Sequence, residues 1–398
     1  MFKVMKIIFV MIVAAYLIPG FAMAEIKLGK HIDSLKLKGD LRVRFERHDK
    51  DSDAGKNTDD NNPRDRLRSR FRLGAFWKSS EEKWEIGAGL ATGGLSSTST
   101  NDTWSDAVEK EFEKDDSIFQ TGDIRLDYAY AKHTIEIPGI NKVNVIVGQQ
   151  KNPFKSAWLL WDSDVRPAGF TGHADLGMVF GTAGAYDVFQ NGNDIAMMYA
   201  LQGGAKIKTG NISFLGTLSG YFYGGLDRYN DADSAEGEYV CKLPNKDYDY
   251  QIIDIYGKID VELDKKIKVS PYLQLFYNTG ADGKKGDGFL KGDLEPDSEN
   301  MGWVMGFSAK MMDASFKLSY AQVGADSCVP YLKNADFGSG LHSGVNVQGA
   351  VIAAGYKITK HFGAELTAYL YEELEEVTKG QENKSSMQMY HIDLKYKF

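Results

Sequence analysis

The chain contains little cysteine and little proline, and it lacks long apolar runs. Only 2 cysteines and 9 prolines occur in 398 residues, which excludes a disulfide-dense scaffold and a proline-rich linker protein. After residue 24, no stretch approaches the roughly 18 apolar residues of a membrane-spanning helix. The mean hydropathy is −0.35, which also excludes a helical membrane protein. A membrane protein of this sequence must therefore cross with strands.

Basic charge is also in deficit. Lysine and arginine total 47 against 55 aspartates and glutamates, for a formal net charge of −8. A net acidic chain is a poor electrostatic partner for nucleic acid, so we expect no nucleic-acid partner. The 42 glycines, 21 tyrosines and 21 phenylalanines suit strands that alternate lipid-facing and water-facing side chains.

The N-terminal segment has the features of a secretory signal. Lys3 and Lys6 precede an apolar run from Ile7 to Ile18, and the small-residue site 22–24 follows. We expect a signal peptide over residues 1–24, with cleavage near Ala24. No Pro/Gly/Ser-rich linker divides the remainder, so residues 25–398 are expected to form one domain.

The last nine residues alternate strictly between apolar and polar side chains. Tyr390, Ile392, Leu394, Tyr396 and Phe398 fall on one face, and His391, Asp393, Lys395 and Lys397 fall on the other. This pattern predicts a strand with one face toward lipid and one toward water. The terminal aromatic residues resemble the signal by which proteins of the Gram-negative outer membrane reach their barrel-assembly machinery. We therefore expect that machinery and outer-membrane lipid as partners.

The same alternation recurs along the whole chain, with short and long connections taking turns. It predicts an all-β fold, a transmembrane antiparallel β-barrel with short periplasmic turns and long extracellular loops. The segments that can be counted give an odd number, whereas both chain ends of such a barrel lie on one side, so the number must be even. Sixteen strands follow if Gly177 to Phe189 holds two short strands. Fourteen follow if that stretch belongs to an inward-folded loop; we favour sixteen.

Arginines gather on one face of the first two predicted strands. They are Arg42 and Arg44 in the segment 35–47, and Arg66, Arg68, Arg70 and Arg72 in the segment 66–78. An arginine at the bilayer midplane costs about 2–4 kcal/mol, so these side chains must face the lumen. Such a ladder would attract anions into a water-filled channel. Alternatively, the arginines pair with lumenal carboxylates and fill the interior. Arg125, beside Asp127 on a later strand, is expected to be paired.

The connection after the fifth predicted strand, Lys151 to about Asp175, is unlike the others. It carries Phe154, Trp158 and Trp161 together with two carboxylates, Asp162 and Asp164. Exposed loops seldom carry such large aromatic side chains, so we expect this one to fold against the barrel wall or into its mouth. There the two aspartates would oppose the arginines and narrow the pore. The alternative is an outward loop that packs on other loops or on another subunit.

Short motifs, most of them between residues 35 and 170, resemble the "putative porin" family of Gram-negative outer membranes. They are the segments Gly39–Glu46, Arg64–Arg68, Ala91–Gly93, Ser99–Asn101, Asp127–Tyr130, Asn152–Phe154 and Trp161–Asp164. The resemblance implies a diffusion channel with its constriction loop after the fifth strand, as in general porins. The resemblance identifies no substrate and no catalytic residues. General porins of this size are commonly trimers, so a homotrimer is a further expectation.

These observations predict an outer-membrane porin that passes small hydrophilic solutes by diffusion, with a preference for anions. Two other classes stay open. A non-conducting barrel that serves as an adhesin or scaffold fits the fold equally well. An outer-membrane hydrolase is disfavoured, because the sequence has no G-x-S-x-G motif. No acidic residue stands at a sequence spacing from Ser339 and His342 that would indicate a catalytic triad.

Two cysteines remain, Cys241 and Cys328, both in predicted long loops. A disulfide between them is chemically permitted outside the cytoplasm. Because the two cysteines are far apart in the sequence, their spacing does not show whether they lie close enough to bond. Neither lies near a second ligand at metal-site spacing. The acidic cluster 230–236 lacks the glycine-centred loop of an EF-hand, so we expect a solvated loop, no metal and no cofactor.

Overall fold

The computed structural model describes ten stretches of the chain. They are residues 25–28, 32–51, 63–94, 96–104, 122–191, 194–226, 250–284, 288–290, 293–377 and 384–398. The expected signal segment 1–24, Cys241 and the acidic cluster 230–236 lie outside them. Within these stretches, no helix is long and apolar enough to cross a membrane.

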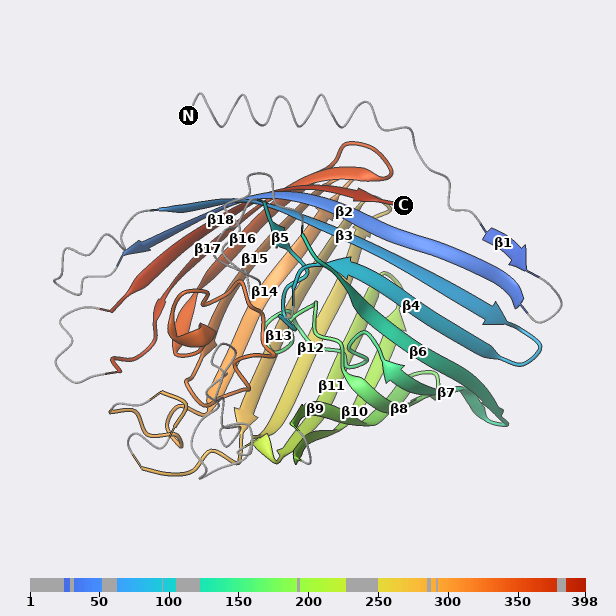
Figure 1. The fold of residues 1–398 in the computed structure, drawn as a ribbon, viewed down its shortest axis with the longest axis horizontal. Helices are drawn as coiled ribbons and strands as arrows, with labels where there is room; N and C mark the ends of the chain where they lie inside the picture. Colours follow the sequence, from blue (N-terminus) through green and yellow to red (C-terminus); the bar gives the residue numbers. More distant parts are fainter. Residues whose placement is uncertain are drawn as a thin grey trace.

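The described strands form one antiparallel sheet that closes on itself (Figure 1). The sheet has 18 strands, of which the short β1 and β5 lie beside the ring, and the other sixteen form it. The last strand pairs with β2 over the register Ser386↔Asp51 to Lys397↔Asp40, which closes the barrel. The elements are β1 (Glu25–Leu28), β2 (Ile32–Asp51), β3 (Arg64–Ser79), β4 (Trp84–Thr92), β5 (Asp102–Thr103), β6 (Ile124–Ile137), β7 (Ile140–Gln149), β8 (Ala168–Asp175), β9 (Val179–Asn191), β10 (Asp194–Thr209), β11 (Ile212–Gly224), β12 (Gln251–Asp264), β13 (Ile267–Asn278), β14 (Met301–Met311), β15 (Ala314–Val323), η3 (His342–Gly344), β16 (Val347–Lys357), β17 (Phe362–Glu373) and β18 (Ser386–Lys397).

The expectation of sixteen strands is confirmed, and the fourteen-strand alternative is wrong. The placement behind that number is wrong, because Gly177 to Phe189 holds only one strand, β9. The additional strand is β8, which precedes this stretch and pairs with both β7 and β9. It occupies the end of the segment expected to be a loop as far as Asp175, so that loop ends earlier than predicted. The apolar/polar alternation of β8 is weak in the sequence, because Gly172 and Ala174 lie on its outer face, where other strands carry bulky apolar side chains.

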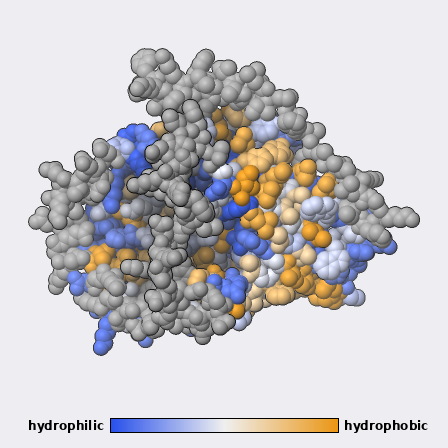
Figure 2. Space-filling model, viewed as in Figure 1, coloured by the Kyte–Doolittle hydropathy of each residue, from blue (hydrophilic) through white to orange (hydrophobic). Residues whose placement is uncertain are grey.

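Side-chain exposure follows the alternation of each strand. Ala200 is 5% exposed and Leu201 is 61% exposed, while Asp254 is fully buried and Ile255 is 54% exposed. The outer face therefore carries the large apolar side chains, as a lipid-facing wall does. Figure 2 shows apolar side chains gathered on the right of the view, where Figure 1 draws β4, β6 and β7.

The C-terminal residue lies over the seam between the first and last long strands. The backbone N–H of Gly39 donates to the carbonyl of Phe398 at 2.9 Å, and the N–H of Phe398 donates back at 3.1 Å. The Phe398 ring stacks against Phe71, with 6.2 Å between centroids. A Cβ on Gly39 would lie within 2.4 Å of the Phe398 ring, so a residue without a side chain is needed there.

Two connections fold into the space that the ring of strands encloses. One is the loop 150–167 between β7 and β8, and the other is the segment 324–346 between β15 and β16, which contains η3. Figure 1 shows both within the ring, in green and in orange. Buried apolar side chains of both connections join those of the inner wall in one cluster.

Candidate functional site

The six predicted lumenal arginines line neighbouring positions on β2 and β3. We call Arg42, Arg44, Arg66, Arg68, Arg70 and Arg72 the arginine wall. The strand register sets Arg42 directly opposite Arg70 and Arg44 opposite Arg68. Like charges directly opposite each other destabilise a strand pair, so this wall requires nearby carboxylates.

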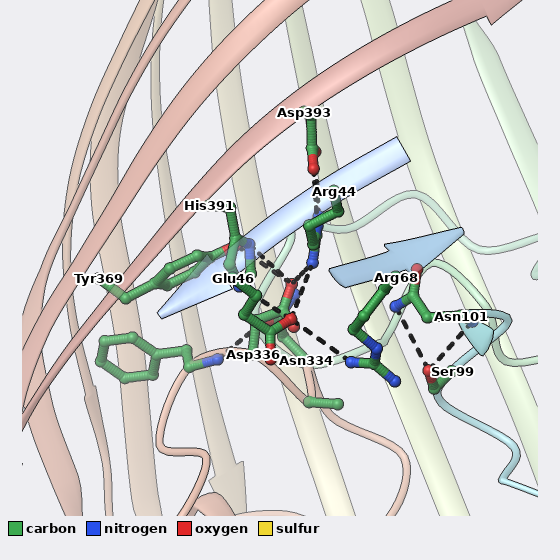
Figure 3. Close-up of polar contacts among 12 residues, drawn as sticks. Arg44, Glu46, Arg68, Ser99, Asn101, Asn334, Asp336, Tyr369, His391 and Asp393 are labelled. Carbon is green, nitrogen blue, oxygen red and sulfur yellow. Dashed lines mark hydrogen bonds and ion pairs between the residues drawn. The ribbon is translucent and has the colours of Figure 1, made fainter. Parts of the chain in front are cut away.

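Glu46 supplies one of these carboxylates. It accepts hydrogen bonds from Arg66 Nε at 3.0 Å and from Arg68 Nη1 at 3.4 Å, and it lies 2.7 Å from His48 Nε2. Its side chain is 1% exposed, and Figure 3 shows it between Arg68 and Arg44. One buried carboxylate therefore compensates two arginines of β3.

Asp40 and Asp393 compensate the rest of the wall. Asp40 accepts from Arg70 Nη2 at 2.6 Å and from Arg72 Nε at 2.9 Å. Asp393 of β18 lies 2.7 Å from Arg44 Nε and 3.8 Å from Arg42 Nη1. The pairing of arginines with lumenal carboxylates, which the sequence left as an alternative, is what the structure contains.

Asp164 of the loop 150–167 contacts the wall from the opposite side. Its carboxylate accepts from Arg72 Nη1 at 3.1 Å and from the Thr100 hydroxyl at 2.8 Å. Burial raises the pKa of Asp164, but the guanidinium groups of Arg70 and Arg72 outweigh it and hold the pKa below its usual range. Asp164 is therefore a charged contact between the loop and the arginine wall.

Asp162 has a different role from the one we expected. Its Oδ2 accepts the backbone N–H of Ala335 at 2.9 Å, and its Oδ1 accepts the N–H of Asp164 at 2.7 Å. The carboxylate thus binds the segment 324–346 rather than an arginine. Burial raises the pKa of Asp162 to about 7, and the nearby carboxylates of Asp164 and Asp336 add to this rise, whereas the two backbone N–H groups oppose it.

A polar cavity of about 180 Å³ lies between the wall, the two inward connections and residues 96–101 of the connection between β4 and β6. Its lining includes Arg42, Arg66, Arg68, Arg70, Glu46, Asn101, Asp162, Asp164 and Asp336. Within the described residues, the Nε atoms of Arg42 and Arg68 are buried without a hydrogen-bond partner.

Asp336 is the site residue that sequence reasoning missed. Its Oδ2 lies 3.6 Å from Arg44 Nη1 and 4.0 Å from His391 Nδ1, and it accepts from the Tyr369 hydroxyl at 3.3 Å (Figure 3). The residue belongs to an irregular segment without alternation, so no periodic pattern places it. By contrast, Asp40, Glu46 and Asp393 share the parity of the arginines, which is a visible signal.

Arg125 does not pair as its position beside Asp127 suggested. Its Nη1 donates to the carbonyl of Gly94 at 2.5 Å and to that of Ser96. Asp127 instead accepts Arg166 Nη2 at 3.2 Å. The register of β4 and β6 shifts at Asp127, and this irregularity frees its carboxylate to meet the loop 150–167.

Cys328 is 1% exposed, in the segment 324–346. Burial raises the pKa of its thiol to about 11. Because Cys241 lies outside the described residues, a disulfide between the two cysteines stays a prediction.

The closed ring, the apolar outer face and the arginines on the inner face define a transmembrane β-barrel. Residues 47–223 match the family described as "Putative porin", so the resemblance read from the motifs is confirmed. No curated protein matches the chain.

Among solved structures, OprB of Pseudomonas putida is 11% identical with a TM-score of 0.55, over 92% of this chain and 94% of OprB. A loop-L8 deletion variant of OmpT of Vibrio cholerae is 10% identical with a TM-score of 0.48, over 92% of this chain and 99% of the variant. At 11% identity, the likeness to OprB shows a shared fold alone.

Proposed function

We propose that the protein is an outer-membrane porin that lets small hydrophilic solutes diffuse through a water-filled channel. The observation that carries the proposal is a row of six arginines on the inner face of a closed, outwardly apolar barrel. Carboxylates pair these arginines, and the charged groups together make this side of the lumen polar, which suits a water-filled channel. The family match supports the same function.

The proposal includes a modest preference for anions. Six guanidinium groups meet five carboxylates in the contacts around the wall, those of Asp40, Glu46, Asp164, Asp336 and Asp393. The local excess is thus about one positive charge, and its field extends roughly one Debye length, about 8 Å at physiological salt. Selectivity should therefore be weak and should fall as ionic strength rises.

Recording from the purified chain in planar lipid bilayers tests both parts. A salt gradient should give single channels with a reversal potential on the anion side. Arg68→Gln should move that potential toward cation preference, because Arg68 shares Glu46 with Arg66 and so contributes to the positive excess. Arg47→Gln is the matched control, since Arg47 is 40% exposed and pairs with Asp65 outside the wall. Absence of channels would overturn the porin proposal.

A second candidate is a non-conducting barrel that serves as a scaffold or adhesin. The buried apolar cluster that both inward connections share favours it, because a packed interior leaves less room for water. The same bilayer recordings distinguish the two functions. The family match and the fold point to a channel rather than to an enzyme, so we propose no catalytic activity.

The remaining proposals concern biogenesis and assembly. We propose signal cleavage near Ala24 and recognition of Tyr396 and Phe398 by the barrel-assembly machinery, followed by insertion into outer-membrane lipid. A homotrimer is proposed by analogy with general porins alone. Cross-linking of the purified protein in detergent, with a monomer-only result as the contrary outcome, tests that assembly.

A further inference from the structure

The segment 324–346 and the loop 150–167 are joined by their backbones. The N–H of Asp162 donates to the carbonyl of Leu332 at 2.8 Å, and the N–H of Asn334 donates to the carbonyl of Leu159 at 2.9 Å. The N–H of Ala335 adds a bond to the Asp162 carboxylate at 2.9 Å. Two connections far apart in sequence therefore behave as one body inside the barrel.

This body is attached to the wall on the side of β13 and β17. Trp158 Nε1 donates to the Tyr272 hydroxyl at 2.9 Å, and its ring packs edge-on against Phe337 at 5.6 Å. Phe337, which is fully buried, packs in turn against Tyr371 at 5.5 Å. The Tyr371 hydroxyl donates to the carbonyl of Ser339 at 2.7 Å. These contacts hold the segment 324–346 against the inner face of β13 and β17.

Ionic contacts attach the same body to the arginine wall. Asp164 reaches Arg72 from the loop 150–167. Asp336 reaches Arg44 from the segment 324–346. The Asp336 side chain is 33% exposed and lines the polar cavity. It is therefore both the contact that positions the segment and a charge at the edge of the remaining open space.

We propose that the segment 324–346 is a second constriction element of the channel, and that Asp336 positions it against the arginine wall. The inference rests on the proposed function and deepens it. The segment 324–346 then bounds the narrow passage together with the loop 150–167 and residues 96–101 of the connection between β4 and β6. Solutes are selected by the ring of charge that Asp336 and Asp164 share with the wall.

The test uses the full-length protein in planar bilayers with two matched variants. Asp336→Asn removes a lumenal charge and the contact with Arg44, whereas Asp40→Asn removes a lumenal charge from a pair made within the barrel wall. Both should shift the reversal potential further toward anions. Only Asp336→Asn should also raise the single-channel conductance, because it releases the segment that narrows the passage. We expect a rise of about two-fold or more.

A second variant covers the case in which Phe337 alone keeps the segment in place. Replacing residues 334–340 by a short Gly-Ser spacer removes Asp336 and Phe337 together, and circular dichroism with heat-dependent gel mobility checks that the barrel forms. A larger conductance in this variant is expected. Unchanged conductance in both variants, in channels that the wild type also forms, overturns this inference and leaves the porin function standing.

The outcomes for the two proposals remain separate. If no variant and no wild-type preparation conducts, the porin function itself fails. If the wild type is silent and the spacer variant conducts, the segment blocks the barrel outright, which supports its constricting role and overturns a constitutively open porin.

Discussion

Arg44 donates two hydrogen bonds to Asp393, from Nε to Oδ1 at 2.7 Å and from Nη2 to Oδ2 at 3.0 Å. The residues face each other in the register of β2 and β18, so the pair spans the seam at which the barrel closes. Both side chains are almost fully buried, at 6% and 2% exposure. A two-pronged charged pair of this kind fixes geometry as well as contributing energy.

Breaking this pair should destabilise the closed barrel. Asp393→Asn leaves Arg44 buried without its full counter-charge, so we expect a loss of about 3–5 kcal/mol in the free energy of unfolding. Denaturant titration in detergent, followed by the mobility difference between heated and unheated samples, measures it. Asp49→Asn is the control, because Asp49 is 48% exposed and its surface pair is worth about 1 kcal/mol or less. Equal losses in the two variants would contradict the role of the seam pair.

Gly39 should tolerate no larger residue. Gly39→Val places a side chain against the Phe398 ring, and overpacking of this kind costs about 1–3 kcal/mol. We expect a lower yield of folded barrel and earlier unfolding, measured by the same mobility assay. The matched control is Gly216→Val, since nothing lies within 4 Å of a Cβ at Gly216. The idea fails if both substitutions behave alike.

The buried Asp162 carboxyl should make the folded arrangement of the two inward connections less stable as pH rises. Burial raises the pKa of Asp162 to about 7, whereas an unfolded aspartate titrates near 3.9. Between these values the folded form keeps a proton that the unfolded form releases, so the contribution of Asp162 to stability is highest below about pH 4 and declines toward pH 7. The decline is at most about 1.4 kcal/mol per pH unit.

Hydrogen exchange of residues 150–167 measures this pH dependence, after correction for the intrinsic effect of pH on exchange. We expect less protection at about pH 8 than at about pH 5 in the wild type. Asp162→Asn removes the titrating group and should remove most of the difference. A variant that keeps the full difference would assign the effect to another group.

The aromatic anchor of the loop 150–167 should be required for its ordered position. Trp161 is 6% exposed and packs against Tyr221 at 5.3 Å between ring centroids. Trp161→Ala should cost about 3–5 kcal/mol of local stability, seen as faster proteolysis within the loop. Trp104→Ala is the control because Trp104 is 47% exposed. Equal protease resistance in wild type and Trp161→Ala would show that other contacts hold the loop.

Much of the barrel could be predicted because strand alternation is a local property. Arg66 to Arg72 at every second position must share a face whatever the remainder of the chain does. The same reasoning fails at β8, where Gly172 and Ala174 give the outer face little apolar signal. It also gave no sign that Asp127 binds Arg166 while Arg125 binds backbone carbonyls, because the register shift at Asp127 depends on two strands together and leaves no mark in either sequence segment.

The sequence by itself determined a barrel with arginines on its inner face, since a period of two and the high cost of charge in lipid leave one solution. Only the tertiary structure decided that Asp40, Glu46 and Asp393 neutralise those arginines, because pairing depends on the register of β2, β3 and β18. It also decided that Asp162 meets Ala335 across 173 residues. Contacts between irregular connections depend on how the whole ring places their ends, and no local pattern encodes that placement.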